Sequence, residues 1–220
     1  MGATRAGRRA VCNDSMPEGV TVYFDYTCPF SWRAAELVEW VAGPLDLTFE
    51  WRHFSLYQFN HDPRERWQLW NEPIDPDDDM GSKGLLPFLA SQAARKQGPD
   101  AYAAFRLGLL RARHRDHRPL NRSTIDEVAD CNGLHMPRFI DDLANPECRT
   151  VLAQEHHYAA ARDVFGTPTF VLPGGETAYL RIRELPSDQH EAVKLFRDYR
   201  HLLESYPYLE TVRRPRPKGN

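Results

Sequence analysis

The residues whose chemistry is clearest are Cys28 and Ser31, which form a Cys-x-x-Ser pattern. The β-branched and aromatic residues from Val20 to Phe24 predict a strand just before them, and Pro29 suits the first turn of a following helix. At a helix N-terminus, unpaired N–H groups and the macrodipole stabilise a thiolate relative to a thiol. The pattern therefore predicts a nucleophilic Cys28. The alternative is that Cys28 is a small buried hydrophobe.

Ser31 stands where a second cysteine would close an intramolecular disulfide, so Cys28 would have to work alone. A lone thiolate can attack a disulfide, form a mixed disulfide and be released by a second small thiol. One helical turn after the cysteine, the Ser31 hydroxyl is expected to donate a hydrogen bond to the sulfur and hold it ionised. The other interpretation is that this serine switched redox activity off.

A second informative motif is Gly166-Thr-Pro-Thr-Phe170. A proline at the mouth of a strand is tolerated only at an edge or a first position, and Pro168 is either the cis-proline of a tight turn or an ordinary trans residue. Beside Cys28, a cis-proline would leave the backbone of Thr167 free to pair with an extended thiol ligand or peptide.

The elements that must position these motifs follow from periodicity. A helix after Cys28 is expected to end at Gly43-Pro44, and the alternation over residues 45–51 predicts a strand parallel to the first. Residues 56–82 form a long aromatic and acidic loop, followed by a helical stretch over 84–161 in which the segment 121–127 carries a helix N-terminal cap. A hairpin over 169–182 and a helix over about 187–203 complete the pattern.

The segments Phe24-Asp-Tyr-Thr-Cys-Pro-Phe-Ser-Trp32 and Phe165-Gly-Thr-Pro-Thr-Phe170, with the helical insertion between them, resemble the DsbA-like branch of the thioredoxin superfamily. Within that branch, Arg52-His-Phe-Ser-Leu56 and the closing 204–210 segment are similar to mycothiol-dependent nitroreductases. Kappa-class glutathione transferases and hydroxychromene-carboxylate isomerases, which have Ser-Pro-x-Ser in this place, are distant relatives. The resemblance implies Cys28 as nucleophile and Pro168 as the cis-proline facing it.

The fold class implied is α/β, a thioredoxin-like fold with a helical domain inserted. Residues 1–17 are then a flexible leader, 18–83 the first half of the thioredoxin-like domain with its long loop, and 84–161 the inserted helical domain. Residues 162–205 form the second half, and 206–220 a tail.

The function expected is that of a DsbA-like thiol oxidoreductase with a monothiol mechanism, which takes mycothiol or glutathione as cosubstrate and a small-molecule or protein disulfide as substrate. The catalytic residues would be Cys28 and Ser31. The small thiol would contact Pro29, Phe30, Trp32, Thr167 and Pro168. The alternatives are a thiol-dependent transferase or isomerase of the kappa-class type and a non-catalytic thioredoxin-fold binding protein.

Other side chains have two interpretations each. Asp25 either tunes the cysteine or simply ends the strand, and His53 either reaches the edge of the active site or is structural. The aromatic residues of the first helix and the long loop either wall an apolar pocket over Cys28 or plug the core; these are Trp32, Tyr57, Trp67 and Trp70. Cys131 and Cys148 are interpreted as structural.

The composition is that of an ordinary globular chain, 41% hydrophobic and 27% charged over 220 residues. A net charge of −3 with interleaved basic and acidic residues argues against nucleic acid as a partner. The histidines and cysteines lack metal-ligand spacing, and neither a membrane-spanning run nor a secretory signal is expected. These features predict a cytoplasmic protein without a metal, and they are compatible with a homodimer.

Overall fold

The computed structural model describes residues 18–61 and 66–214, so the expected leader 1–17 lies outside the described residues. Within them a four-stranded sheet has the order β2-β1-β3-β4. Its strands are β1 (Glu18–Phe24), β2 (Leu47–His53), β3 (Thr169–Val171) and β4 (Thr177–Tyr179). β1 is parallel to β2, and the β1–β3 and β3–β4 pairs are antiparallel. The predicted parallel pair and the predicted hairpin are confirmed.

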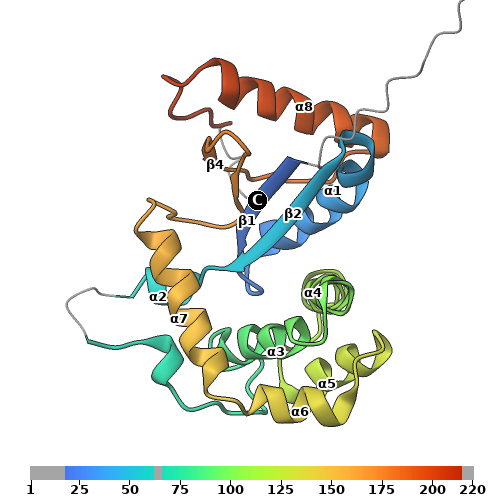
Figure 1. Cartoon of the computed structure of the whole chain (residues 1–220), viewed down its shortest axis with the longest axis vertical. Coiled ribbons are helices and arrows are strands. Elements are labelled where there is room, and N and C mark those ends of the chain that lie inside the picture. The colour runs from blue at the N-terminus through green and yellow to red at the C-terminus, as the bar shows by residue number, and fades with distance from the viewer. Residues whose placement is uncertain (1–17, 62–65, 215–220) are drawn as a thin grey trace, which may run out of the picture.

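Two helices, α1 (Pro29–Leu45) and α8 (Gln189–Ser205), pack against each other and against one face of the sheet (Figure 1). Alternate strand residues point to this face, as the period of a strand requires. The ring of Phe196 on α8 contacts the rings of Phe49 and Phe170 at 5.8 Å, edge to face in both cases. This apolar layer anchors β1, whose end leads into the loop that carries Cys28.

Helix α1 runs one residue past the end predicted at Gly43-Pro44 and stops at Leu45, where Asp46 takes a left-handed conformation with φ of +52°. A proline in the last turn lacks the N–H that would bond the carbonyl four residues earlier. That carbonyl belongs to Trp40, and the side chain of Gln189 donates a hydrogen bond to it at 3.0 Å. A contact from α8 therefore compensates for the proline, and the helix continues.

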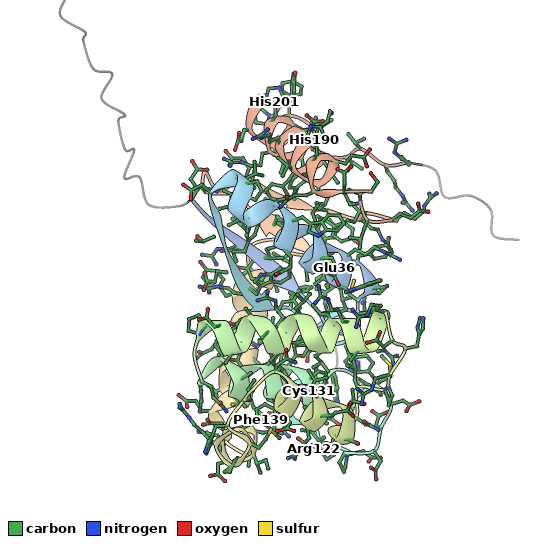
Figure 2. All side chains as sticks on the ribbon, turned by 90° about the vertical axis from the view of Figure 1, so that its right-hand side faces the viewer. Glu36, Arg122, Cys131, Phe139, His190 and His201 are labelled. Carbon is green, nitrogen blue, oxygen red and sulfur yellow. The ribbon has the colours of Figure 1, made fainter. Side chains whose placement is uncertain are left out.

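The chain between β2 and β3 is mostly helical and forms a separate layer beside the end of the sheet (Figure 1). Its elements are α2 (Leu56–Phe59), a 3-10 helix (Leu69–Asn71), α3 (Leu85–Arg95), α4 (Pro99–His114), α5 (Arg122–Cys131), α6 (Met136–Leu143) and α7 (Glu147–Ala160). The cap predicted within residues 121–127 is confirmed and belongs to Asn121, whose side chain accepts from the N–H of Thr124 at 3.0 Å. In Figure 2, Arg122 and Phe139 lie in this layer, at the end opposite His190 and His201 of α8.

A buried polar network joins the helical layer to the sheet. The Nδ1 atom of His53 lies 2.7 Å from Glu155 Oε2, Arg95 donates to Glu155 Oε1 at 2.6 Å, and His53 Nε2 lies 2.9 Å from Ser91 Oγ. Burial raises the pKa of Glu155, but His53 and Arg95 outweigh this effect and lower it to about 2. His53 and Ser91 are both 0% exposed, so this Ser-His-Glu arrangement is a structural connection, and the structural interpretation of His53 holds.

The two cysteines of the helical layer differ from each other. Cys148 is buried, and its Sγ donates to the carbonyl of Asp142 at 3.3 Å, as a structural residue would. Cys131 is exposed, which does not fit the interpretation of it as a structural residue. The buried face of α5 is formed by Thr124, Ile125, Val128 and Ala129, and Cys131 lies beyond that face in the last turn.

Candidate functional site

Cys28 occupies the N-cap position of α1, directly after the loop that follows β1. Its backbone is extended, with φ of −93° and ψ of 116°. The N–H of Cys28 donates to the carbonyl of Asp25 at 3.1 Å, and its own carbonyl accepts from Ser31 N–H at 3.0 Å, which closes the first turn. Pro29 follows at the first helical position, where a missing N–H leaves no bond unmade. The strand, cysteine and helix therefore follow one another as predicted.

The second motif lies against this cysteine. The Thr167–Pro168 peptide bond is cis, and the Sγ of Cys28 donates to the carbonyl of Thr167 at 3.3 Å. The cis-proline is fixed on the sheet because its carbonyl accepts from Leu180 N–H at 3.1 Å. The Thr167 hydroxyl is buried without a hydrogen-bond partner in the described part of the chain. Two motifs 139 residues apart thus form one site.

A pocket of about 390 Å³ opens beside the sulfur. It is lined by Thr27, Cys28, Pro29, Phe30, Leu56, Phe165, Gly166, Thr167, Tyr179 and Arg181. Cys28 itself is only 5% exposed, so a reactant reaches the sulfur through this pocket. Phe165 is 62% exposed and contacts the ring of Tyr179 edge to face at 5.7 Å, which makes the rim of the pocket apolar.

Positive charge is concentrated on one wall of this pocket. The guanidinium of Arg181 lies 3.9 Å from the centre of the Phe30 ring, and that of Arg33 lies 5.4 Å from the same ring. Neither arginine forms an ion pair with a carboxylate among residues 18–61 and 66–214. Of the two, Arg181 lines the pocket, so the wall offers one uncompensated cation to an anionic group that enters.

Ser31 is placed differently from the prediction. Its hydroxyl accepts a hydrogen bond from the N–H of Asp25 at 3.2 Å, and the described residues include no bond between Ser31 Oγ and Cys28 Sγ. The reason is that α1 turns the Ser31 side chain inward, where it is 0% exposed, beneath the loop that carries the cysteine. Ser31 positions that loop, and the polar partner of the sulfur is the carbonyl of Thr167.

Asp25 is buried under the same loop and holds it together. Its Oδ1 accepts from the N–H and the hydroxyl of Thr27, at 2.7 and 2.8 Å, and its Oδ2 accepts from Leu56 N–H at 2.7 Å. Burial raises the pKa of Asp25, and these hydrogen bonds offset only part of the rise. The carboxyl group therefore ties the cysteine loop to the start of α2, so Asp25 does more than end the strand.

The side chains of Trp32, Tyr57, Trp67 and Trp70 do not line the pocket, so the interpretation of them as its wall is wrong. Trp32 lies one turn further along α1 and faces α4, where it stacks on His114 with ring centres 6.4 Å apart. His114 Nε2 lies 2.8 Å from the carbonyl of Tyr26, and Glu36 receives hydrogen bonds from Trp32 and Arg111. Figure 2 shows Glu36 on the side of α1 that faces α4. These contacts connect α4 to α1 and to the loop that carries Cys28.

Sequence reasoning missed six residues of the pocket. Thr27, Phe165 and Gly166 lie within the two motifs, whereas Leu56, Tyr179 and Arg181 lie outside them. Leu56 directly follows Ser55, which caps α2 by accepting from Gln58 N–H. Tyr179 is the last residue of β4, the strand beside the cis-proline strand, and Arg181 follows two residues later. The predicted hairpin could have placed Tyr179 next to Thr169. The sequence gives no indication that Arg181 would reach the pocket.

His156 supports the start of α2 and gives a test of pH dependence. Its Nδ1 accepts from Ser55 N–H at 3.2 Å, and burial, with a smaller effect of His157, lowers the pKa of His156 from 6.5 to about 4. Its contribution to stability is therefore present above pH 6.5 and is lost as the pH falls toward 4, because the unfolded chain binds a proton first. Urea unfolding should show that His156→Asn, which keeps an acceptor, removes roughly 3 kcal/mol of this pH dependence. An unchanged pH profile in the variant would contradict this assignment.

The described residues include no group of three or more histidines, cysteines or carboxylates that could hold a metal ion. None of the helices in residues 18–61 and 66–214 has the length and apolar character needed to span a bilayer.

The family described as DSBA-like thioredoxin domain matches residues 19–187. Among solved structures, the cytosolic disulfide reductase DsbM from Pseudomonas aeruginosa, determined with GSH, is 20% identical, covers 87% of this chain and 100% of its own, and has a TM-score of 0.54. The thiol-disulfide oxidoreductase MdbA from Actinomyces oris is 15% identical, with 81% and 80% covered and a TM-score of 0.57. A 2-hydroxychromene-2-carboxylate isomerase is 19% identical, with 88% and 100% covered and a TM-score of 0.57.

At these identities the likeness to the solved structures concerns the fold, which confirms the predicted thioredoxin-like α/β class with helices between its two halves. No curated protein sequence matches the chain.

Proposed function

The chain belongs to the DSBA-like thioredoxin domain family, and on this premise we propose that it is a thiol–disulfide oxidoreductase in which Cys28 works without a second cysteine. The observation that carries the proposal is the position of the sulfur. It lies 3.3 Å from Thr167 O, beside the cis-proline, and at the wall of an open pocket. A thiol placed there can meet a disulfide that enters the pocket.

The proposed cycle uses two thiol–disulfide exchanges. The Cys28 thiolate attacks one sulfur of a substrate disulfide, so that a mixed disulfide with Cys28 forms and the other sulfur leaves as a thiolate. A small thiolate then attacks the mixed disulfide and releases the second substrate thiol, leaving the small thiol bound to Cys28. A second small thiolate frees Cys28 and departs as the oxidised small disulfide. The substrate disulfide gains two electrons, and two small thiols supply them.

We infer that the small thiol is mycothiol or glutathione and that the reaction takes place in a reducing cytoplasm. The backbone of Thr167 next to the cis-proline is available to an extended ligand, and Pro29 and Phe30 form the adjoining wall. The substrate is a small-molecule or protein disulfide that tolerates the apolar rim of Phe165 and Tyr179. We also propose that the chain is related to the mycothiol-dependent nitroreductases that its sequence resembles.

Intact mass spectrometry tests the proposal directly. The purified protein is incubated with oxidised glutathione and, in parallel, with oxidised mycothiol, and each adduct is mapped by peptide digestion. We expect one adduct per chain on Cys28, with the buried Cys148 unmodified. Adducts confined to the exposed Cys131, with Cys28 unmodified by both disulfides, would overturn the proposal.

The charge of the pocket wall predicts which small thiol is preferred. Glutathione carries carboxylates and mycothiol carries none, so the guanidinium of Arg181 should favour glutathione. We expect Arg181→Gln to raise the KM for glutathione about threefold to tenfold with kcat nearly unchanged, because Arg181 is exposed and acts on binding. Arg183→Gln, the same substitution at an exposed residue that does not line the pocket, is the matched control. Equal effects of both variants would contradict the role of Arg181.

A further inference from the structure

A second pocket of about 460 Å³ is lined in part by residues 162–164, which directly precede Phe165 of the cysteine pocket in the chain. It is lined by Thr21, Tyr23, Arg52, Tyr158, Arg162, Asp163, Val164, Val171, Gly175 and Thr177. None of these residues lines the cysteine pocket. The strand residues belong to the sheet face that α1 and α8 leave uncovered, since their neighbours Val22 and Phe170 point to the other face.

Tyr23 provides the observation that points to a ligand. Its side chain is 2% exposed and lines this pocket, yet its hydroxyl has no hydrogen-bond partner in the described part of the chain. That hydroxyl is not fully buried, so it faces the open space of the pocket, where it can donate a hydrogen bond to a ligand. Burial raises the pKa of Tyr23, and Arg52 and Arg162 offset only part of the rise, so the phenol stays a protonated donor.

The two arginines lie on the ring of Tyr158. The guanidinium carbon of Arg162 is 3.4 Å and that of Arg52 is 5.7 Å from the ring centre. Arg52 is paired with the exposed Glu50 at 2.8 Å, whereas Arg162 has no ion pair among residues 18–61 and 66–214 and donates only to the carbonyl of Tyr158. The pocket therefore presents one free guanidinium, one partly neutralised guanidinium and a phenol donor to its interior.

The remaining lining residues indicate the size and character of the ligand. Val164 and Val171 supply an apolar wall, and Thr21 and Thr177 add hydroxyl groups. Asp163 is the one carboxylate among the lining residues, so a highly charged polyanion fits less well than a ligand with a single oxyanion group. We propose that this pocket binds a small organic acid whose carboxylate or phosphate group lies between Arg52 and Arg162 and accepts a hydrogen bond from Tyr23.

Isothermal titration calorimetry of the full chain tests this site with benzoate, phenyl phosphate and inorganic phosphate as probes. Saturable binding of benzoate alone would identify a carboxylate ligand, and saturable binding of phenyl phosphate alone a phosphate ligand. We expect Arg162→Gln to weaken the bound probe about tenfold, the loss of one charge-assisted hydrogen bond. Tyr23→Phe should weaken it about fivefold while leaving the unfolding midpoint nearly unchanged, because the substitution breaks no hydrogen bond within the described residues.

The matched control is Arg197→Gln, an exposed arginine on α8 at the opposite face of the sheet, which should change probe affinity less than about twofold. Cys28→Ser should also leave probe affinity unchanged, so the outcome is independent of the proposed redox function. The proposal is overturned if no probe binds saturably, or if Arg162→Gln and Arg197→Gln have equal effects. It is also overturned if Tyr23→Phe binds the probe as tightly as the natural sequence.

Discussion

Replacing Cys28 with alanine is expected to lower the rate of disulfide reduction by at least about a thousandfold, because the substitution removes the nucleophile itself. The assay is reduction of a small disulfide with glutathione or mycothiol as the reductant. The fold should survive, since Cys28 makes a single side-chain hydrogen bond, to Thr167, and its position as the N-cap of α1 depends on backbone contacts. Circular dichroism of the variant checks this directly.

The control for this variant is Cys131→Ala, which removes the exposed thiol of α5 and should leave the rate unchanged. If the Cys28→Ala protein keeps a thiol-dependent transferase or isomerase activity, the bound small thiol is the nucleophile, as in the kappa-class alternative. If the natural protein exchanges with no small disulfide, the non-catalytic binding function is favoured. Ser31→Ala should act only through the Asp25 loop that Ser31 positions, so it should lower the rate far less than Cys28→Ala does.

Glu155→Ala is expected to destabilise the protein by about 3 to 5 kcal/mol, measured by urea unfolding near pH 7. The substitution leaves Arg95 and His53 without their carboxylate partner at the junction of the sheet and the helical layer. Because His53 is fully buried, it cannot recover that interaction from water. The loss is therefore much larger than that of a surface ion pair.

The pH dependence of the same variant gives a second measurement. The pKa of Glu155 is lowered to about 2 in the folded protein, so its contribution is present above pH 4.5 and is lost as the pH falls toward 2. The difference in stability between Glu155→Ala and the natural protein should shrink over that range. Glu147→Ala, which breaks the exposed pair with Lys96, should cost less than about 1 kcal/mol. Similar losses in both variants would contradict the importance of the buried network.

Much of the fold could be predicted from local patterns. Strand alternation over Val20–Phe24 and the hairpin around Gly174-Gly175 depend on near neighbours in the chain, and both are present in the structure. The end of α1 could not be predicted, because the contact that allows Pro44 inside the last turn comes from Gln189 on α8. Burial of Trp32 against α4 likewise depends on how the helical layer packs on α1.

The sequence by itself determined that Cys28 starts a helix after a strand, and that a Thr-Pro pair opens a later strand, since both signals lie within a few residues. Only the tertiary structure decided that Thr167 meets the sulfur, that Ser31 turns toward Asp25, and that Arg181 reaches the Cys28 pocket. Side-chain periodicity specifies which face of an element is apolar but not which distant residue lies opposite it. Those contacts form when the sheet and the helical layer pack together.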